Sequence, residues 1–286
     1  MQKITAGCFS VALGVLLTAC VTGPYAATNK VYKRQARDFA RQIRAQPTLL
    51  ADSLPPAPYW AGTINFNLRK PNYVIIHHTA QHNTEQTLKT FTLTKTQVSA
   101  HYVIGRDGQT FHMLSDYFRA WHGGAARWGN VTDINSVSIG IELDNDGTEP
   151  FQEAQLTSLL RVLGSLKRTY NIPAANFVGH GDIAPTRKSD PSALFPWQKL
   201  AARGFGLWYD EAVLTDTTAA PFATDSTGLA LPGITPREAL RIIGYDTQDM
   251  PAAIRAFKRH FVPDDASAEL TERDRRILFN LYRKYL

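Results

Sequence analysis

The pattern of hydrophobic and polar positions predicts a mixed α/β domain in the middle of the chain. Residues 73–78, YVIIHH, form a short apolar run rich in β-branched side chains, as expected for a buried strand. Residues 137–143, VSIGIEL, alternate apolar with small side chains and predict a second central strand. Residues 151–170 predict an amphipathic helix, because leucines recur there at helical spacing, at Leu156, Leu159, Leu160, Leu163 and Leu166.

Shorter segments complete this domain. Residues 84–94 predict a helix, and residues 100–114 predict a β-hairpin that turns at Asp107-Gly108. Residues 176–178 predict a short strand that leads into His180. Because strands and helices are mixed along one stretch of chain, we expect an α/β fold with a single mixed central β-sheet flanked by helices.

The first residues predict an export signal and a lipid anchor. The uncharged apolar run at 4–19 is shorter than the roughly 20 residues of a membrane span and fits a signal peptide over residues 1–19. Cys20 directly follows the tripeptide LTA, which resembles the bacterial lipobox, so Cys20 is expected to become the acylated first residue. Val21, in place of Asp, implies retention at the outer membrane if the source is Gram-negative.

The remaining segments divide by composition. Residues 20–58 are expected to form a lipid-anchored tether and N-terminal arm, with a surface helix at 30–46 followed by a proline-rich extended stretch. Residues 59–206 hold the central domain, and residues 207–232, rich in Thr, Ala and Asp, predict a linker. A small helical domain is expected over residues 233–286, from helix signals at 236–243, 251–261 and 269–285.

Composition and charge narrow the chemistry. With 44% apolar and 20% charged residues the chain is globular rather than disordered, and its net charge of +6 suits an anionic partner such as a cell-wall polymer or anionic lipid. The basic residues look scattered and no nucleic-acid motif appears, so we expect no nucleic-acid binding. The chain has two cysteines, Cys8 in the signal segment and Cys20 at the predicted lipid, so site chemistry must use His, carboxylates and Lys.

The segment from Val178 to Pro191, VGHGDIAPTRKSDP, carries the densest group of candidate site residues. Its glycines and prolines make a regular helix or strand unlikely, and such a loop can fold back to aim His180 and Asp190 at one point. One imidazole and one carboxylate are typical zinc ligands, and a catalytic zinc site needs a third protein ligand. The best source is the IIHHTA segment, where histidines stand at the end of the predicted strand. Two histidines and a carboxylate also describe iron oxygenases, and spacing alone does not separate the two metals.

Five motifs in order carry a family resemblance: IIHHTA, SAHYVIGRDG, AWHGG, SIGIEL and GHGDIAPTRKSDPS. Together they resemble the zinc-dependent N-acetylmuramoyl-L-alanine amidases of the amidase-2 and peptidoglycan-recognition superfamily, over roughly residues 59–204. The resemblance implies one Zn²⁺ held by His77, His180 and Asp190, with water in the fourth position.

The same resemblance implies roles for further residues. Glu142 matches the catalytic carboxylate that moves protons, and Lys188 matches a cation that supports the oxyanion. The alternative for Glu142 is a carboxylate at a strand end that faces solvent, which its small and buried neighbours disfavour; without the motif, Lys188 would be interpreted as a solvated charge beside Arg187. His101, Trp121 and His122 match the substrate groove, although for His101 a structural role in a strand is the alternative.

Two positions leave alternatives open. His78 stands where relatives often have Tyr or Asn, and it could replace His77 as ligand if the strand register differed. The C-terminal segment resembles a small three-helix peptidoglycan-binding domain, and the alternative is a packing appendage without a ligand.

The expected function is hydrolysis of the amide bond between N-acetylmuramic acid and L-alanine in peptidoglycan stem peptides, by a zinc-activated water. The expected partners are peptidoglycan or muropeptides and, through the anchor, the outer membrane on its periplasmic side. The rivals are a non-catalytic peptidoglycan-binding lipoprotein on the same fold and a zinc peptidase that cuts within the stem peptide.

Overall fold

The structure is a computed structural model that describes residues 23–45, 65, 68, 70–215, 222 and 233–286. It divides into two compact units, Met1–Thr63 and Ile64–Leu286. The predicted signal peptide, the lipidation candidate Cys20 and most of the proline-rich stretch lie outside the described residues. No helix in the described part of the chain is both long and apolar enough to cross a membrane.

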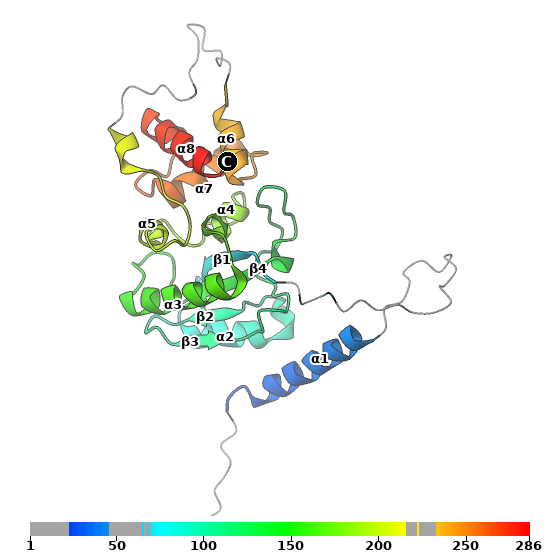
Figure 1. The fold of residues 1–286 in the computed structure, drawn as a ribbon. Coiled ribbons are helices and arrows are strands. Elements are labelled where there is room, and N and C mark those ends of the chain that lie inside the picture. Colours follow the sequence, from blue (N-terminus) through cyan, green and yellow to red (C-terminus); the bar gives the residue numbers. More distant parts are fainter. Residues whose placement is uncertain (1–22, 46–64, 66–67, 69, 216–221, 223–232) are drawn as a thin grey trace, which may run out of the picture. The chain divides into compact units, whose positions relative to one another are not determined.

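The described part of the first unit is one helix, α1 (Ala26–Arg44), drawn in dark blue in Figure 1. The sequence predicted a surface helix at 30–46, and none of the residues of α1 is buried. Its N-terminus lacks a side-chain cap, and Arg41 and Arg44 lie in its last turn, where cations favour the helix dipole.

The second unit is organised around a five-stranded mixed sheet with strand order β3-β2-β4-β1-β5. Strands β2, β4, β1 and β5 run parallel, and β3 pairs antiparallel with β2. The strands are β1 (Tyr73–His78), β2 (Tyr102–Ile104), β3 (Thr110–His112), β4 (Ser138–Leu143) and β5 (Phe177–Gly179). The expected single mixed sheet is therefore confirmed, as are the central strands and the hairpin.

One face of the sheet packs against α3 (Glu153–Tyr170), the long helix drawn in green (Figure 1). Val74 and Ile76 of β1 join Ile139 and Ile141 of β4 and the α3 leucines in one buried cluster. The α3 side chains in this cluster are Leu156, Leu159, Leu163 and Leu166. The predicted amphipathic helix is thus present, and its leucine stripe covers this face.

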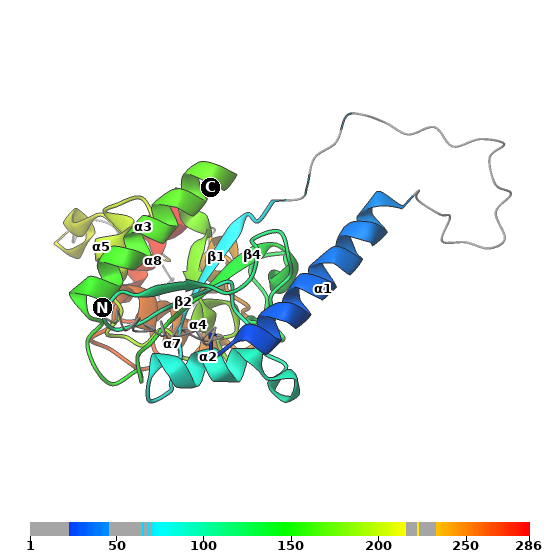
Figure 2. The ribbon, with the colours of Figure 1, turned by 90° about the horizontal axis from the view of Figure 1, so that it is seen from below.

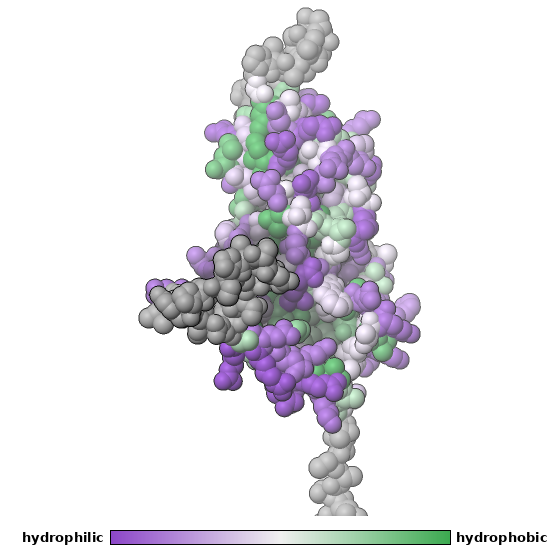
Figure 3. Space-filling model, turned by 90° about the vertical axis from the view of Figure 1, so that its right-hand side faces the viewer, coloured by the Kyte–Doolittle hydropathy of each residue, from purple (hydrophilic) through white to green (hydrophobic). Residues whose placement is uncertain are grey.

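The opposite face packs against the C-terminal helices α6 (Pro236–Ile243), α7 (Met250–Phe261) and α8 (Glu272–Lys284). Ile75 of β1 and Val178 of β5 share a buried cluster with side chains of these helices, among them Leu240, Phe257 and Leu278. All three helix signals in the sequence are confirmed. Seen from the side in Figure 3, this helical part presents mainly hydrophilic side chains to solvent.

A close approach fixes the end of α6 to a loop of the sheet domain. Gly244 has φ +136, and a Cβ there would lie 2.4 Å from Trp128. The Gly129 N–H donates to the Gly244 carbonyl at 2.7 Å, and the Trp128 ring meets the Tyr245 ring edge to face at 5.0 Å. Only glycine combines this backbone with this contact.

The other helices are short and lie around the sheet. Viewed from below, α2 borders the strands on the side away from α3 and α5 (Figure 2). These helices are α2 (Thr84–Thr92), α4 (His180–Ile183) and α5 (Trp197–Ala201), with 3-10 turns at Thr94–Thr96, Ile134–Ser136, Ala174–Asn176 and Glu211–Leu214. The helix predicted at 84–94 corresponds to α2.

Candidate active site

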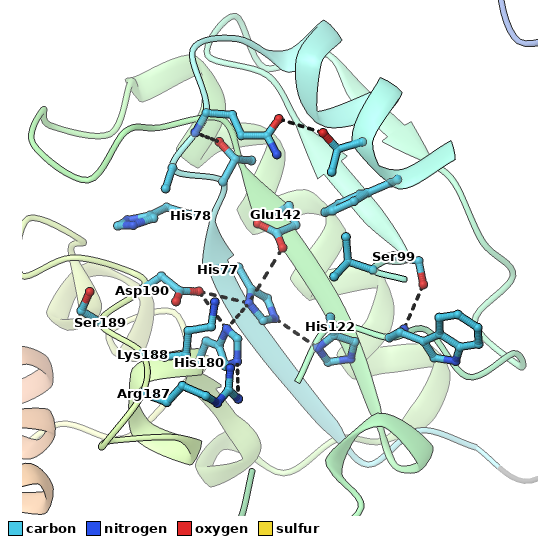
Figure 4. A pocket seen from close by; sticks show the side chains of 17 residues that line it. His77, His78, Ser99, His122, Glu142, His180, Arg187, Lys188, Ser189 and Asp190 are labelled. Carbon is cyan, nitrogen blue, oxygen red and sulfur yellow. Dashed lines mark hydrogen bonds and ion pairs between the residues drawn. The ribbon is translucent and has the colours of Figure 1, made fainter. Parts of the chain in front are cut away.

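The register of the parallel strands places two predicted site residues side by side. Residues directly opposite each other in neighbouring strands point to the same face, and His77 of β1 pairs with Glu142 of β4. His180 directly follows β5, which pairs with β1 on its other side. His78 is one residue beyond His77 and therefore points to the other face of the sheet, as Figure 4 shows.

Three buried side chains converge at the end of these strands (Figure 4). His77 Nδ1 lies 2.9 Å from His180 Nδ1, and each of these nitrogens lies 3.1 Å from Asp190 Oδ2. These three residues form a group able to hold a metal ion in the described part of the chain, and the group contains His77 rather than His78. The loop therefore folds back as the sequence suggested.

The loop from His180 to Asp190, the two ligand candidates, contains one turn of helix, α4, so the expectation of no regular helix is wrong for His180–Ile183. The Gly181 N–H donates to the Asp190 carbonyl at 2.6 Å and closes the loop. A Cβ at Gly181 would approach the carbonyl oxygens of Lys188 and Asp190 to 3.3 and 3.4 Å. Gly181, which had argued against a helix, instead allows the two ends of the loop to approach each other.

Hydrogen bonds assign the protons of the two imidazoles. Ser138 Oγ donates to the Ile134 carbonyl at 2.6 Å, so its 3.1 Å contact with His122 Nε2 must have the imidazole as donor. Burial and neighbouring histidines hold the pKa of His122 well below its ordinary value, so its Nδ1 is a lone-pair acceptor. His77 Nε2, at 3.1 Å, donates to it, which leaves a lone pair on His77 Nδ1.

The second imidazole is fixed more simply. His180 Nε2 lies 3.1 Å from the Gly123 carbonyl and must donate to it, so His180 Nδ1 also carries a lone pair. With both imidazoles neutral, two lone pairs and a carboxylate oxygen face one point, which is a donor set that a cation can bind. Tetrahedral zinc, with bonds of about 2.0–2.1 Å, places its ligand atoms about 3.3 Å apart, so the observed spacings fit it.

Burial and the contacts within the cluster set the charge states of His77 and Asp190. Burial lowers the pKa of His77 to about 4, with the neighbouring His180 adding to the effect. Burial alone would raise the pKa of Asp190, but its contacts with His180 and His77 outweigh burial and leave that pKa below its ordinary value. Asp190 is therefore an anion and His77 a neutral imidazole near pH 7, the protonation states that metal binding would require.

Glu142 is buried beside this cluster. Its Oε1 lies 3.9 Å from His77 Nδ1, and its Oε2 has no hydrogen-bond partner. Burial raises the pKa of Glu142 to about 8, Asp190 adds to the rise, and Lys188 opposes it. A carboxylate with a free oxygen and a pKa near neutrality is suited to accept and return a proton.

A cleft of about 410 Å³ opens over these groups. Lys188 and Asp190 lie on one side, and Trp121, whose side chain is 52% exposed, lies at the rim. Further lining comes from Phe91 and Val98. Most of the lining is polar, and a cleft in which polar groups converge beside a few apolar and aromatic side chains is suited to bind a polar substrate.

A family model described as N-acetylmuramoyl-L-alanine amidase matches residues 67–193, which include the whole cluster. The N-acetylmuramoyl-L-alanine amidase AmiD of Escherichia coli strain K12 is 33% identical over 236 residues, covering 74% of this chain and 82% of AmiD. The chain belongs to the N-acetylmuramoyl-L-alanine amidase family.

Solved structures of related amidases have the same fold. A complex of E. coli AmiD with anhydro-N-acetylmuramic acid-L-Ala-D-gamma-Glu-L-Lys superposes with a TM-score of 0.65 at 29% identity, over 78% of this chain and 93% of the other. Pseudomonas aeruginosa AmpDH3 in complex with anhydromuramic pentapeptide gives 0.67 at 28% identity, over 82% and 99%. Both matches extend well beyond residues 67–193.

In this amidase the three groove residues expected from the sequence occupy different environments. Trp121 and His122 both line the cleft, and His122 also contacts His77. His101 is fully buried, accepts from the Gly140 N–H at 3.1 Å and faces the Phe118 carbonyl at 2.9 Å. Those contacts fit the structural alternative for His101.

Sequence reasoning missed two groups that hold the ligand loop of the amidase. Arg187 Nη2 donates to the carbonyls of Gly123 and Ala125 at 2.7 and 2.9 Å and joins the loop to the neighbouring one. Asp182 is buried, and no local pattern marks it, because its partners come from the distant C-terminal helices.

Those partners surround the Asp182 carboxylate in the turn that begins with His180. Tyr245 OH donates to Oδ1 at 2.9 Å, and His260 Nδ1 lies 2.8 Å from Oδ2. Oδ2 also accepts from the Gly179 N–H at 2.7 Å. The C-terminal helices thereby contact the turn that carries a metal-ligand candidate.

Proposed function

We propose that this amidase hydrolyses the amide bond between N-acetylmuramic acid and L-alanine in peptidoglycan stem peptides, with one zinc ion held by His77, His180 and Asp190. The observation that carries the proposal is the convergence of two imidazole lone pairs and one carboxylate oxygen within 3.1 Å. The single ring proton of each imidazole lies on Nε2 and is donated to another acceptor, His122 Nδ1 or the Gly123 carbonyl, as is usual for metal-ligating histidines.

When bound, zinc would act as a Lewis acid on the scissile carbonyl and increase the acidity of an attacking water. Glu142 accepts the proton of that water on its free oxygen and passes it to the leaving nitrogen of L-alanine. Lys188 carries a fixed positive charge at the edge of the cleft, where it balances the negative charge that develops on the carbonyl oxygen.

The substrate class is supported by the compounds bound to relatives. The AmiD and AmpDH3 structures contain anhydromuropeptides. We propose that this chain takes muropeptides or peptidoglycan in the same way, with Trp121 packing against a sugar or peptide at the rim.

The proposal includes a location and a domain arrangement. Residues 1–19 act as signal peptide, and Cys20 carries a lipid that anchors the enzyme to the outer membrane, facing the periplasm. Residues 20–58 form the tether and arm, residues 59–206 the zinc amidase domain, residues 207–232 a linker, and residues 233–286 a peptidoglycan-binding-like helical domain.

The test is product identification with muropeptides. We expect release of intact stem peptides that begin with L-alanine, loss of this activity on treatment with a chelator, and its return with Zn²⁺. Glu142→Gln should retain zinc and lose at least about 10²-fold in kcat, whereas Glu153→Gln, on the exposed start of α3, should match wild type.

Three other outcomes would refute parts of the proposal. Products cut within the stem peptide would identify a peptidase. Binding of peptidoglycan without turnover, in a zinc-loaded enzyme, would identify a non-catalytic binder. Full activity after verified removal of metal would exclude the zinc site as the catalytic centre.

A further inference from the structure

The helix α1 gathers most of the chain's excess positive charge. It contains six basic residues and one acidic residue, Asp38, which gives it a net charge of +5, whereas the whole chain has +6. Most basic residues are spread along the rest of the chain, but six of the 31 lie in this segment of 19 residues, about 28 Å long, where a single acidic residue offsets them.

The charges form one stripe along the helix. Apart from the adjacent pair Lys33 and Arg34, the basic residues follow one another at intervals of three or four, which places all six on one face: Lys30, Lys33, Arg34, Arg37, Arg41 and Arg44. Their only acidic neighbour, Asp38, pairs with Arg41 at 3.0 Å. A stripe of this length and sign complements a surface that carries many negative charges.

A second stripe runs along the other side of the same helix. Tyr32, Ala36, Phe39 and Ile43 also recur at intervals of three or four, displaced by two residues, or about 200°, from the basic stripe. The side chains of Phe39 and Ile43 are 48% and 69% exposed. An exposed aliphatic side chain such as Ile43 beside Phe39 suits a lipid interface better than a polar polymer such as peptidoglycan.

We propose that α1 is an interfacial helix that binds an anionic phospholipid surface. Its apolar stripe, centred on Phe39 and Ile43, enters the boundary between headgroups and acyl chains, and the long basic side chains reach the lipid phosphates. Helices with a strongly basic polar face and an aromatic apolar face bind membranes in this way. A single acyl chain or a polybasic segment alone anchors weakly, whereas the two together hold a protein stably.

This inference does not require the proposed lipid on Cys20, and the experiment separates the two. The unlipidated chain from residue 21, which keeps every described residue, is sedimented with vesicles at physiological salt. We expect binding to vesicles of phosphatidylcholine with 30% phosphatidylglycerol (an amount of roughly this size gives a strongly negative surface) and little binding to pure phosphatidylcholine. Mass analysis of membrane-extracted protein tests Cys20 independently.

Two variants test the two stripes. Replacing Lys30, Lys33, Arg34 and Arg37 by Gln keeps helix propensity, and it should weaken vesicle binding by at least roughly 10²-fold, since each cation near an anionic surface contributes about fivefold. Phe39→Ser combined with Ile43→Ser should also weaken binding while leaving the charge unchanged. Neither variant should change the rate of muropeptide cleavage by the soluble enzyme.

A matched control removes the same charge elsewhere. It replaces four exposed arginines of the second unit by Gln: Arg161, Arg203, Arg241 and Arg255. If this control weakened binding as much as the α1 variant, net charge and not the helix would be responsible, and the proposal would be wrong. Equal binding to neutral vesicles, or binding to purified peptidoglycan with none to vesicles, would also overturn it.

Discussion

The hydrogen-bond chain behind His77 gives a prediction about metal affinity. His122→Ala removes the acceptor for His77 Nε2, which lies 3.1 Å from His122 Nδ1 in a buried position. The His77 proton is then free to occupy Nδ1, where it competes with the metal. A buried donor without its partner costs about 1–3 kcal/mol, which corresponds to a loss of roughly 5–150-fold in zinc affinity. Outer partners of metal ligands typically contribute about 10–100-fold, in the same range.

A substitution at Ser138 should perturb the same hydrogen-bond chain more mildly. Because Ser138 Oγ fixes the His122 proton on Nε2, Ser138→Ala lets His122 turn its proton toward His77, and we expect a smaller loss of affinity, below about tenfold. In a His122→Ala background, Ser138→Ala should have no further effect on zinc binding, because the link it acts through is gone.

The assay is competition for zinc with a chelator of known affinity, followed by unfolding of the metal-free proteins in urea. His101→Ala is the matched control, since it removes a buried imidazole that bonds Gly140 and Phe118 but no ligand. It should lower stability and leave zinc affinity within about twofold. If His122→Ala behaved like His101→Ala in both measurements, the assignment of the His77 proton would be refuted.

Three further predictions concern the same region. Glu142 has a folded pKa of about 8, above its ordinary 4.5, so the folded state binds more protons than the unfolded state. The contribution of Glu142 to the stability of the metal-free chain should therefore decline as pH rises from about 4.5 to 8. Urea unfolding across this range should show a flatter dependence of stability on pH for Glu142→Gln than for wild type, and parallel profiles would contradict this. Asp182→Ala removes the carboxylate that Tyr245 and His260 both contact and should lower the unfolding free energy by about 3–5 kcal/mol. Tyr245→Phe removes one of those contacts and should cost about 1 kcal/mol. Equal costs for the two variants would argue against a carboxylate shared by several partners. Gly140→Ala should reduce zinc affinity, measured by chelator competition, because its Cβ would lie 2.4 Å from the His122 ring; unchanged affinity would show that the ring can move without consequence.

Much of the fold could be predicted because its signals are local. The β-branched run of β1 and the leucine spacing of α3 each identify an element without knowledge of its neighbours. The C-terminal helices also begin with side-chain caps at Thr235, Asp249 and Thr271, which are local features of the chain. Strand order and register are set by packing between distant segments, and they had to come from the structure.

The candidate site divides in the same way. His77, His180 and Asp190 could be proposed from residue type, position and motif. The partners of those residues could not, because His122 reaches His77 from a loop 45 residues away in sequence, and Asp182 meets Tyr245 and His260 across 63 and 78 residues. The choice between His77 and His78 likewise depended on which face of the sheet each one occupies.

The packing of α6, α7 and α8 on the sheet has a consequence for anyone who would shorten or recombine this enzyme. These helices cover Ile75, Ile134 and Val178, so truncation before residue 233 would expose an apolar surface on the sheet, next to the strands that carry the ligand candidates. A shortened chain would tend to aggregate before its catalytic power could be judged. Exchanging the C-terminal helices with those of a relative would require redesign of the buried side chains on both sides of the interface between these helices and the sheet.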